Sequence, residues 1–325
     1  MKAVNNSSLH CSGHMKNNKE NMFMEIGLII EILGLPGTIV SLWIFCCCMK
    51  SWKPHTLFLF NLVLADFLVL INVPFRIDTH LRGKWVFGWV WCRISLFMLT
   101  VNRSASIGFM TAVALDRYFK VVHPHHCISQ MTSVQAGWLA GLIWAAVVVR
   151  GIPLLTANLF HQASGKCRSF NSYEEDPVPI KLHYIAFVAE FLLPWFLLLF
   201  CSAKIVCRLR QRRLGRKLKG RKAIRAVMVI ILVFTLCFMP SVITGLAAAY
   251  IKGNHPHDCE SYTKVTQVFM ICIVLTYLNS ALDPIVYAFS SSMFRDALKT
   301  SICFKKIFRP VTPSRSSSCS SDGLG

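Results

Sequence analysis

Apolar residues gather into seven long stretches, which are separated by short polar segments. The stretches cover residues 25–49, 55–79, 90–122, 133–155, 183–207, 223–250 and 264–290. Each is longer than the roughly 20 residues that an α-helix needs to cross about 30 Å of hydrocarbon. A membrane β-barrel would instead show segments of about 10 residues with alternating polarity, which the chain lacks. The pattern therefore predicts an all-α fold, a seven-transmembrane helix bundle.

The chain beyond this predicted bundle (25–290) is expected to be cytoplasmic. Residues 291–325 should form a short amphipathic helix followed by a Ser-rich tail. The helix would set basic side chains against anionic membrane lipid, and Cys303 within it is a candidate for palmitoylation. The Ser-rich end is open to phosphorylation, which would add negative charge. The apolar side of the helix would consist of Phe294, Leu298, Ile302 and Phe304.

Composition and charge favour a membrane protein. Hydrophobic residues make up 54% of the chain and charged residues 15%, whereas soluble proteins carry about 25% charged residues. Residues 1–24 lack the apolar segment of a signal peptide and contain glycosylation sequons at Asn5 and Asn6, so we expect an extracellular N-terminus. Lys and Arg residues concentrate on the cytoplasmic side of membrane proteins, and their positions along this chain agree with that orientation. The net charge of +20 is thus a membrane-topology signal and not a nucleic-acid-binding surface; most of it comes from 50–53, 117–120, 204–225 and 295–315.

The chain has fourteen cysteines, and four of them would face the oxidising side: Cys11, Cys92, Cys167 and Cys259. An even number there suggests two disulfides. We expect pairing of Cys92 with Cys167 and of Cys11 with Cys259. Four cysteines allow three pairings, however, and the spacing does not choose among them. The other cysteines are expected to pack as small apolar residues.

Short motifs follow one another along the predicted helices. LVLAD lies in the second, DRY ends the third, CFMP lies in the sixth and NSALDPIVY in the seventh. The prolines among them remove helical hydrogen bonds and allow kinks, while buried acids require polar partners. The residues that carry the series are Asp66, Asp116, Arg117, Tyr118, Trp144, Pro194, Phe238, Pro240, Asn279, Asp283, Pro284 and Tyr287.

This series resembles the rhodopsin-like G-protein-coupled receptors over essentially the whole chain. The resemblance implies a plasma-membrane receptor whose Asp116, Arg117 and Tyr118 act in G-protein coupling, with Asp116 holding Arg117 in the resting state. It also implies an allosteric sodium ion at mid-membrane, and no other cofactor or metal. A water-filled polar network without an ion is the alternative. The polar cluster concerned would consist of Asp66, Ser106, Asn279 and Asp283.

Arg103 interrupts the third apolar stretch, where hydrocarbon would penalise a charge. Leu99, one turn earlier, shares its helical face, and Arg103 lies about 16 Å along the helix from Cys92. At that depth the guanidinium would form the floor of an outward-facing pocket. Two interpretations follow. Arg103 either binds the carboxylate of a ligand, or is structural and pairs with Glu190 or Asp78 of other helices.

A narrower resemblance is carried by LTVNRSAS, VALDRYFKVVHPHH, FCSAKIVCRLRQR and TYLNSALDPIVY. These segments are similar to the hydroxycarboxylic acid receptors and to the related oxoeicosanoid and hydroxy-eicosatetraenoic acid receptors. The resemblance implies a small carboxylic acid ligand and coupling to inhibitory heterotrimeric G proteins. Long-chain oxo- or hydroxy-eicosanoids stay open as ligands, because Gly245 replaces an arginine of the group, and Arg76 and Arg150 replace apolar residues of its niacin-responsive member. The implied pocket consists of Arg103, Tyr277, Ser169, Phe170, Leu99, His183 and Phe187, with Arg76 as a further candidate.

Two other protein classes place charges inside membrane helices. A transporter of organic anions would show repeated halves and broken helices, and neither is visible in the chain. A membrane enzyme would need a catalytic constellation, which the helix motifs do not supply. We therefore expect a receptor and no enzymatic activity.

Overall fold

The computed structural model describes residues 17–49, 52–156, 160–161, 166–167, 178–210, 214–255 and 258–307. Within these residues, seven helices are long and apolar enough to cross a membrane. They are α1 (Asn17–Trp43), α2 (Pro54–Arg82), α3 (Gly88–Val122), α4 (Ser133–Thr156), α5 (Val178–Arg210), α6 (Leu214–Asn254) and α7 (Cys259–Ser290). The shorter elements are η1 (Ile44–Cys48), η2 (Cys127–Gln130), the antiparallel pair β1 (Phe160–His161) and β2 (Lys166–Cys167), and α8 (Ser292–Ile307).

Six of the predicted apolar stretches each fall within one of these helices, and the first, 25–49, runs through α1 and η1 to Met49. The all-α fold with seven membrane-length helices is thus confirmed. The apolar spans agree closely with the prediction; the first runs over Gly27–Cys48. Helix α1 itself begins earlier, at Asn17, because polar helix-forming residues extend it beyond its apolar span. The expected division between residues 24 and 25 therefore marks the start of the apolar span and not the start of the helix.

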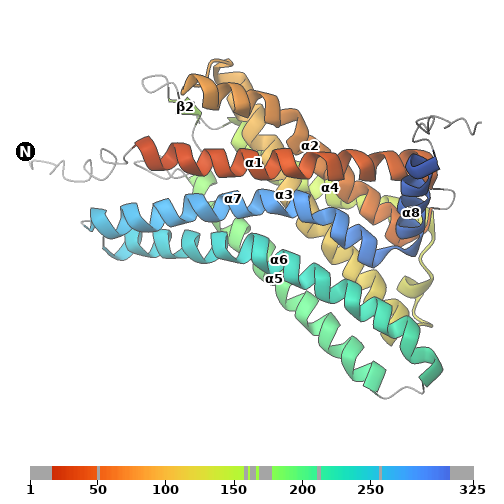
Figure 1. Ribbon diagram of the computed structural model, residues 1–325. Helices are drawn as coiled ribbons and strands as arrows, with labels where there is room; N and C mark the ends of the chain where they lie inside the picture. Colours follow the sequence, from red (N-terminus) through yellow and green to blue (C-terminus); the bar gives the residue numbers. More distant parts are fainter. Residues whose placement is uncertain are drawn as a thin grey trace, which may run out of the picture.

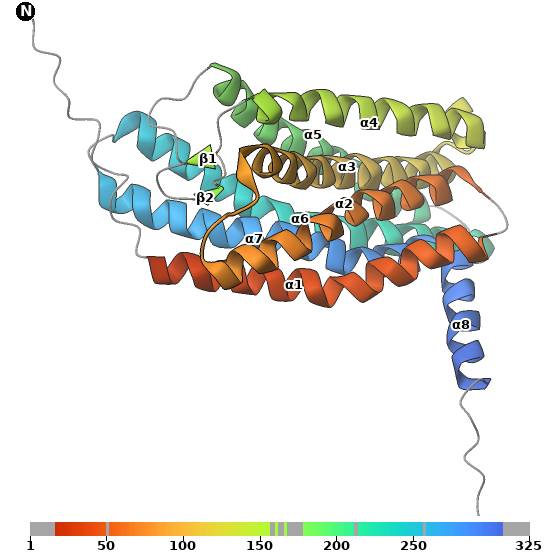
Figure 2. The ribbon, with the colours of Figure 1, turned by 90° about the horizontal axis from the view of Figure 1, so that it is seen from above.

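The helices run along one common direction, and α8 turns away from that direction at one end of the bundle (Figure 1 and Figure 2). We call this the α8 end. The opposite end, which we call the disulfide end, holds the start of α1 and the β1–β2 pair. There Cys92 of α3 and Cys167 of β2 form the expected disulfide, with their Cα atoms 5.6 Å apart. Cys259, at the start of α7, is also disulfide-bonded, and its predicted partner Cys11 lies outside the described residues.

Helix α3 runs through the middle of the bundle, where it contacts α2, α4, α5 and α6. Its residues Phe109, Met110 and Val113 are completely buried. By contrast, Trp138 of α4 and Leu193 of α5 expose 74% and 71% of their surface. Apolar side chains on the outside are stable where lipid, which is as apolar as leucine, replaces water. The polar residues of α3 are consequently held at the centre of the protein.

The first and last of the seven helices, α1 and α7, pack against each other and close the bundle. Gly34 permits their close approach, because a Cβ atom at this position would lie 2.9 Å from the Cα of Ala281. Small residues let membrane helices come this close. We refer to the contact of Gly34 with Ala281 as the α1–α7 seam.

Aromatic contacts anchor α8. Phe294 is buried, and its ring centroid lies 5.4 Å from that of Phe45 in η1 and 5.6 Å from that of Tyr287 in α7. Arg295 Nη1 also donates a hydrogen bond of 2.7 Å to the carbonyl of Ala288. The short helix expected after the seventh apolar stretch is thus confirmed.

Candidate functional site

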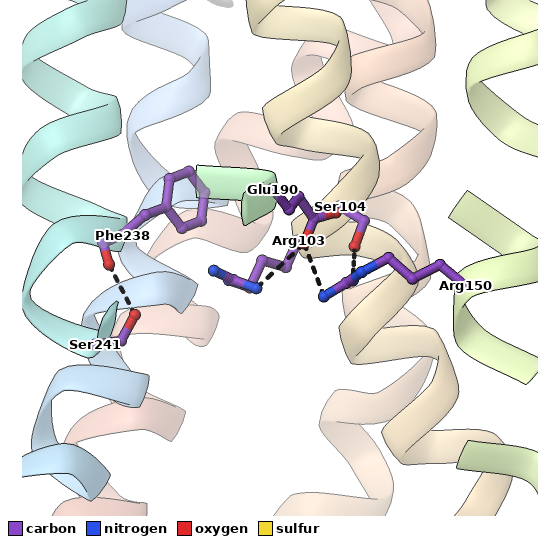
Figure 3. A network of polar contacts seen from close by, with 6 residues as sticks. All are labelled: Arg103, Ser104, Arg150, Glu190, Phe238 and Ser241. Atoms are coloured by element: carbon purple, nitrogen blue, oxygen red, sulfur yellow. Dashed lines mark hydrogen bonds and ion pairs between the residues drawn. The ribbon is translucent and has the colours of Figure 1, made fainter. Parts of the chain in front are cut away.

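Arg103 projects from α3 towards α5 and α6 (Figure 3). Its guanidinium carbon lies 3.7 Å from the ring centroid of Phe187 in α5 and 5.7 Å from that of Phe238 in α6. The residue is buried, with 8% of its surface exposed. Aromatic ring faces attract a guanidinium, so these two rings hold the cation in a largely apolar environment.

One carboxylate interacts with two arginines beside this site. Glu190 Oε2, from α5, lies 3.4 Å from Nη1 of Arg103 and 2.9 Å from Nη2 of Arg150 in α4. Arg150 Nη1 also donates a hydrogen bond of 2.6 Å to Oγ of Ser104 on α3. Two guanidiniums and one carboxylate leave this group with one net positive charge. We call these four residues the Arg103 cluster.

A structural Arg103 was expected to pair with Glu190 or Asp78, and the structure shows the first of these two contacts. Glu190 is one of the two acids considered, but its closer ion pair is with Arg150. The other acid, Asp78, pairs instead with Arg82 at 2.8 Å, so its assignment as the partner of Arg103 is wrong. The reason is local: Asp78 and Arg82 are four residues apart on α2 and face each other on the same helical surface.

One edge of the Arg103 guanidinium has no hydrogen-bond partner among the described residues. Its Nε and Nη2 atoms are both buried and unbonded. These two nitrogens point the same way and match the two oxygens of a carboxylate. A buried donor without a partner costs on the order of 1–3 kcal/mol, and more when it is charged. The open edge of Arg103 (Nε and Nη2) thus consists of two buried donors without a partner in the described part of the chain, and the Nε and Nη2 atoms of Arg150 are likewise without hydrogen bonds there.

The structure describes some of the other predicted pocket residues and not others. Phe187 contacts Arg103, and Leu99 lies one turn before it on α3, half-buried. Arg76 of α2 stacks on the ring of Tyr277 in α7, with its guanidinium carbon 4.5 Å from the ring centroid. These residues come from α2, α3, α5 and α7, and the structure shows two contacts among them, Arg103 with Phe187 and Arg76 with Tyr277. Ser169 and Phe170 lie outside the described residues, as does the side chain of His183.

The shared role of Glu190 was not foreseen, nor was the contact of Ser104. The signal for Glu190 was present, because an acid within an apolar membrane stretch requires a partner. Arg150 gives a similar signal in α4. What sequence alone leaves open is which faces of α4 and α5 turn towards α3, and hence that the three charges meet.

A second polar cluster lies nearer the α8 end. Asp66 accepts hydrogen bonds from Asn102 at 3.3 Å and from Tyr287 at 2.9 Å, and Asn279 donates to Asp283 at 3.1 Å. The expected members Asp66, Ser106, Asn279 and Asp283 are all buried. The oxygens of Ser106 Oγ, Asn279 Oδ1 and Asp283 Oδ1 have no partner among the described residues.

These unpaired oxygens are the donor type that a small hard cation prefers, and they suit ordered water equally well. Among the described residues, no group of three or more His, Cys, Asp or Glu side chains is placed to hold a metal ion. Any cation here would therefore depend on hydroxyl and amide oxygens as well as on the two carboxylates. Sodium binding stays a prediction.

At the α8 end, Arg117 bonds to a different partner from the one expected. Asp116 makes an ion pair with Lys120 at 2.6 Å, and an Nη2 hydrogen of Arg117 is donated to the carbonyl of Ser290, where α7 ends. The expectation that Asp116 holds Arg117 is thus not what the structure shows. Adjacent residues of a helix point in different directions, whereas residues four apart face each other. Tyr118, the third residue of the motif, packs against Phe200 of α5 with ring centroids 6.0 Å apart.

Comparison with known proteins decides the class. The family model for the 7 transmembrane receptor (rhodopsin family) matches residues 37–287. The chain belongs to the rhodopsin family of seven-transmembrane receptors. It is therefore a multi-pass membrane receptor of the G-protein-coupled type and not an enzyme, as the motif series indicates.

Several receptors of this family are similar along most of their length. Human hydroxycarboxylic acid receptor 2 is 42% identical over 275 residues, which are 83% of this chain and 75% of that protein. Human hydroxycarboxylic acid receptor 1 is 41% identical over 289 residues, covering 87% of this chain and 81% of that receptor. Human oxoeicosanoid receptor 1 is 38% identical over 264 residues, covering 81% and 67%. The resemblance of the receptor to this group is therefore confirmed.

Proposed function

We propose that the receptor recognises a small molecule through its carboxylate, which binds the open edge of Arg103. The ligand would be a hydroxycarboxylic acid or a related fatty-acid metabolite. The observation that carries the proposal is the pair of buried, unbonded nitrogens, Nε and Nη2, on a guanidinium that lies over the ring of Phe187 and near that of Phe238.

Charge supports the same conclusion. Glu190 is shared by Arg103 and Arg150, so it neutralises only one of the two guanidiniums. An uncompensated charge in a low-dielectric interior is strongly unfavourable, and a monoanionic ligand would restore neutrality. A neutral ligand would leave both the charge and the two donors unsatisfied.

The names of the similar receptors agree with an acid. Hydroxycarboxylic acid receptors and the mouse 12-(S)-hydroxy-5,8,10,14-eicosatetraenoic acid receptor, which is 35% identical over 268 residues, are named for carboxylic acids of very different length. A long-chain oxo- or hydroxy-eicosanoid is the second candidate, favoured by the similarity to oxoeicosanoid receptor 1. Both candidates use the same anchor, so they differ only in what lies beyond the carboxylate.

Orientation follows from the distribution of basic residues. Lys120, Arg208, Arg210 and Lys222 lie near the α8 end of their helices, and α8 adds Arg295 and Lys299. Because Lys and Arg concentrate on the cytoplasmic side, the α8 end is assigned to the cytoplasm and the disulfide end to the exterior of the plasma membrane. Glycosylation of Asn5 or Asn6, palmitoylation of Cys303 and arrestin binding by the tail belong to the same proposal.

We assign signalling to inhibitory G proteins, because the motif resemblance described for the sequence implies that class. Asp116, Arg117 and Tyr118 lie at the α8 end, where a G protein would bind. For Arg117 to reach a G protein, it would leave the carbonyl of Ser290, and Lys120 would keep Asp116 occupied.

The test is nucleotide exchange with purified components. Lactate, 3-hydroxybutyrate, medium-chain hydroxy acids and a hydroxy-eicosatetraenoic acid would be added to purified receptor and inhibitory G protein, each beside its methyl ester. We expect at least one acid to accelerate GTP loading and every ester to fail. Equal activation by an acid and its ester would refute carboxylate recognition, and transport of the acid without GTP loading would indicate an anion transporter.

A further inference from the structure

Glu190 is itself a carboxylate within reach of Arg103, and could compete with a ligand for it. The same oxygen, Oε2, serves both of its ion pairs, and the pair with Arg150 is shorter by half an ångström, at 2.9 Å against 3.4 Å. Figure 3 shows Glu190 between the two arginines, with the rest of the Arg103 guanidinium directed towards Phe238. The position of this one carboxylate therefore decides whether Arg103 can accept a second one.

Arg150 interacts with groups on two helices through one ion pair and one hydrogen bond. It contacts Glu190 on α5, and it donates the 2.6 Å hydrogen bond to Ser104 on α3. Both contacts are within the bundle, where charges attract more strongly than in water. Arg150 thus draws the Glu190 carboxylate towards α4. Without it, Arg103 would be the only cation in contact with Glu190 in the Arg103 cluster.

We propose that Arg150 is a positioning residue for ligand recognition: it holds Glu190 on the α4 side and so keeps the open edge of Arg103 available to the ligand's carboxylate. This inference rests on the proposed function, in which an acid binds Arg103. If Glu190 moved fully onto Arg103, it would neutralise the guanidinium and repel an incoming anion. The ligand contacts of Arg103 would then depend on a side chain that does not touch the ligand.

The proposal predicts that Glu190→Gln restores the acid sensitivity that Arg150→Gln removes. Arg150→Gln should raise the half-maximal concentration of 3-hydroxybutyrate, and of a hydroxy-eicosatetraenoic acid, by about tenfold or more, a coupling size typical of residues in one charged network. Glu190→Gln alone should leave these values unchanged or lower them, because the internal competitor has lost its charge. The double variant Arg150→Gln/Glu190→Gln should return to within about threefold of the wild type, since Arg103 no longer has a competing partner.

Two further variants separate positioning from other roles. Arg150→Lys keeps a positive charge near Glu190 and should retain most of the wild-type sensitivity, although it cannot hold Glu190 and Ser104 in the same forked geometry. Arg93→Gln removes a guanidinium from the disulfide half of α3, where Arg93 contacts Trp89 and the carbonyl of Leu155, and should leave acid sensitivity unchanged. This control measures the general effect of losing one positive charge.

The experiment would measure GTP loading on purified inhibitory G protein at matched receptor amounts, together with the rise in melting temperature that each acid produces. Wild-type sensitivity in Arg150→Gln would overturn the inference, as would a double variant that is as weak as Arg150→Gln alone. Should Glu190→Gln fail to fold, the comparison of Arg150→Gln with the double variant still decides. Failure of the proposed function looks different: Arg103→Ala would then respond to acids as the wild type does.

Discussion

Replacing Arg103 by alanine removes the group on which the proposed acid recognition depends. Two nitrogens of its open edge would each donate to a charged oxygen, and such bonds contribute roughly 1.5–3 kcal/mol apiece. Repulsion from Glu190, which lies 3.4 Å from Nη1, offsets part of that gain. We therefore expect a loss of about 2–5 kcal/mol, the range measured when one partner of a buried charged pair is removed. At about 1.4 kcal/mol per factor of ten, affinity should fall roughly 30-fold to several thousand-fold.

The receptor itself should tolerate the substitution. Glu190 keeps its closer ion pair with Arg150, at 2.9 Å, so Arg103→Ala does not leave a buried carboxylate without a partner. Arg103→Lys should restore little, because an ammonium cannot reproduce the two-point geometry of the guanidinium edge. Arg82→Ala is a suitable control. Arg82 is exposed, and its ion pair is with Asp78 on the same helix.

The assay is GTP loading over a range of acid concentrations, with each variant matched to the wild type in surface amount. The acid and its methyl ester would be compared on every variant. A wild-type acid response in Arg103→Ala would refute the reasoning, because the acid would then bind without the open edge of Arg103. In that case Arg76, which stacks on Tyr277, would become the next anchor to test.

Four further outcomes can be checked separately. Tyr277→Phe should weaken acid binding by about 1–3 kcal/mol, the contribution of one hydrogen bond from the tyrosine hydroxyl to a charged group of the ligand. The stacking of Arg76 on the ring is kept in this variant. An unchanged affinity in a binding assay would show that the hydroxyl bonds within the bundle instead. In cells, an active acid should lower cAMP, and pertussis toxin should abolish the effect; a toxin-insensitive calcium rise alone would contradict inhibitory coupling. Peptide mapping without reduction should find Cys11 linked to Cys259, and recovery of any other partner for Cys259 would reject that pairing. Deletion of residues 314–322 should reduce agonist-driven internalisation, and undiminished uptake would remove the assigned arrestin role of the tail.

The fold was largely predictable because membrane helices must satisfy two demands at once. A segment has to be long enough to cross the hydrocarbon, and it has to be apolar along that whole length. Both demands are visible in single-sequence patterns, which is why the span Gly27–Cys48 agrees with the expected 25–49. The place where α1 begins was less predictable, since polar residues before the span extend the helix without adding apolar character.

The position of Arg103 was predictable, and its surroundings were less so. Arg103 could be placed deep on an inward face because helical spacing fixes its direction and depth relative to Cys92. Its neighbours depend on how α4 and α5 rotate about their own axes, a property of packing that no local pattern encodes. Asp116 is a different case: its ion pair with Lys120, four residues later, follows from helix geometry and could have been expected.

The α1–α7 seam joins the membrane helix that is synthesised first to the one that is synthesised last. The contact of Gly34 with Ala281 cannot form until Ala281 has left the ribosome, a delay on the order of tens of seconds at about 5–20 residues per second. Throughout that interval α1 lacks the helix that packs on Gly34 in the finished bundle, and a small residue in a membrane helix lets other helices approach closely. The bundle is therefore closed by a contact that can form only at the end of biosynthesis, whereas α3 meets its neighbours α2, α4, α5 and α6 earlier.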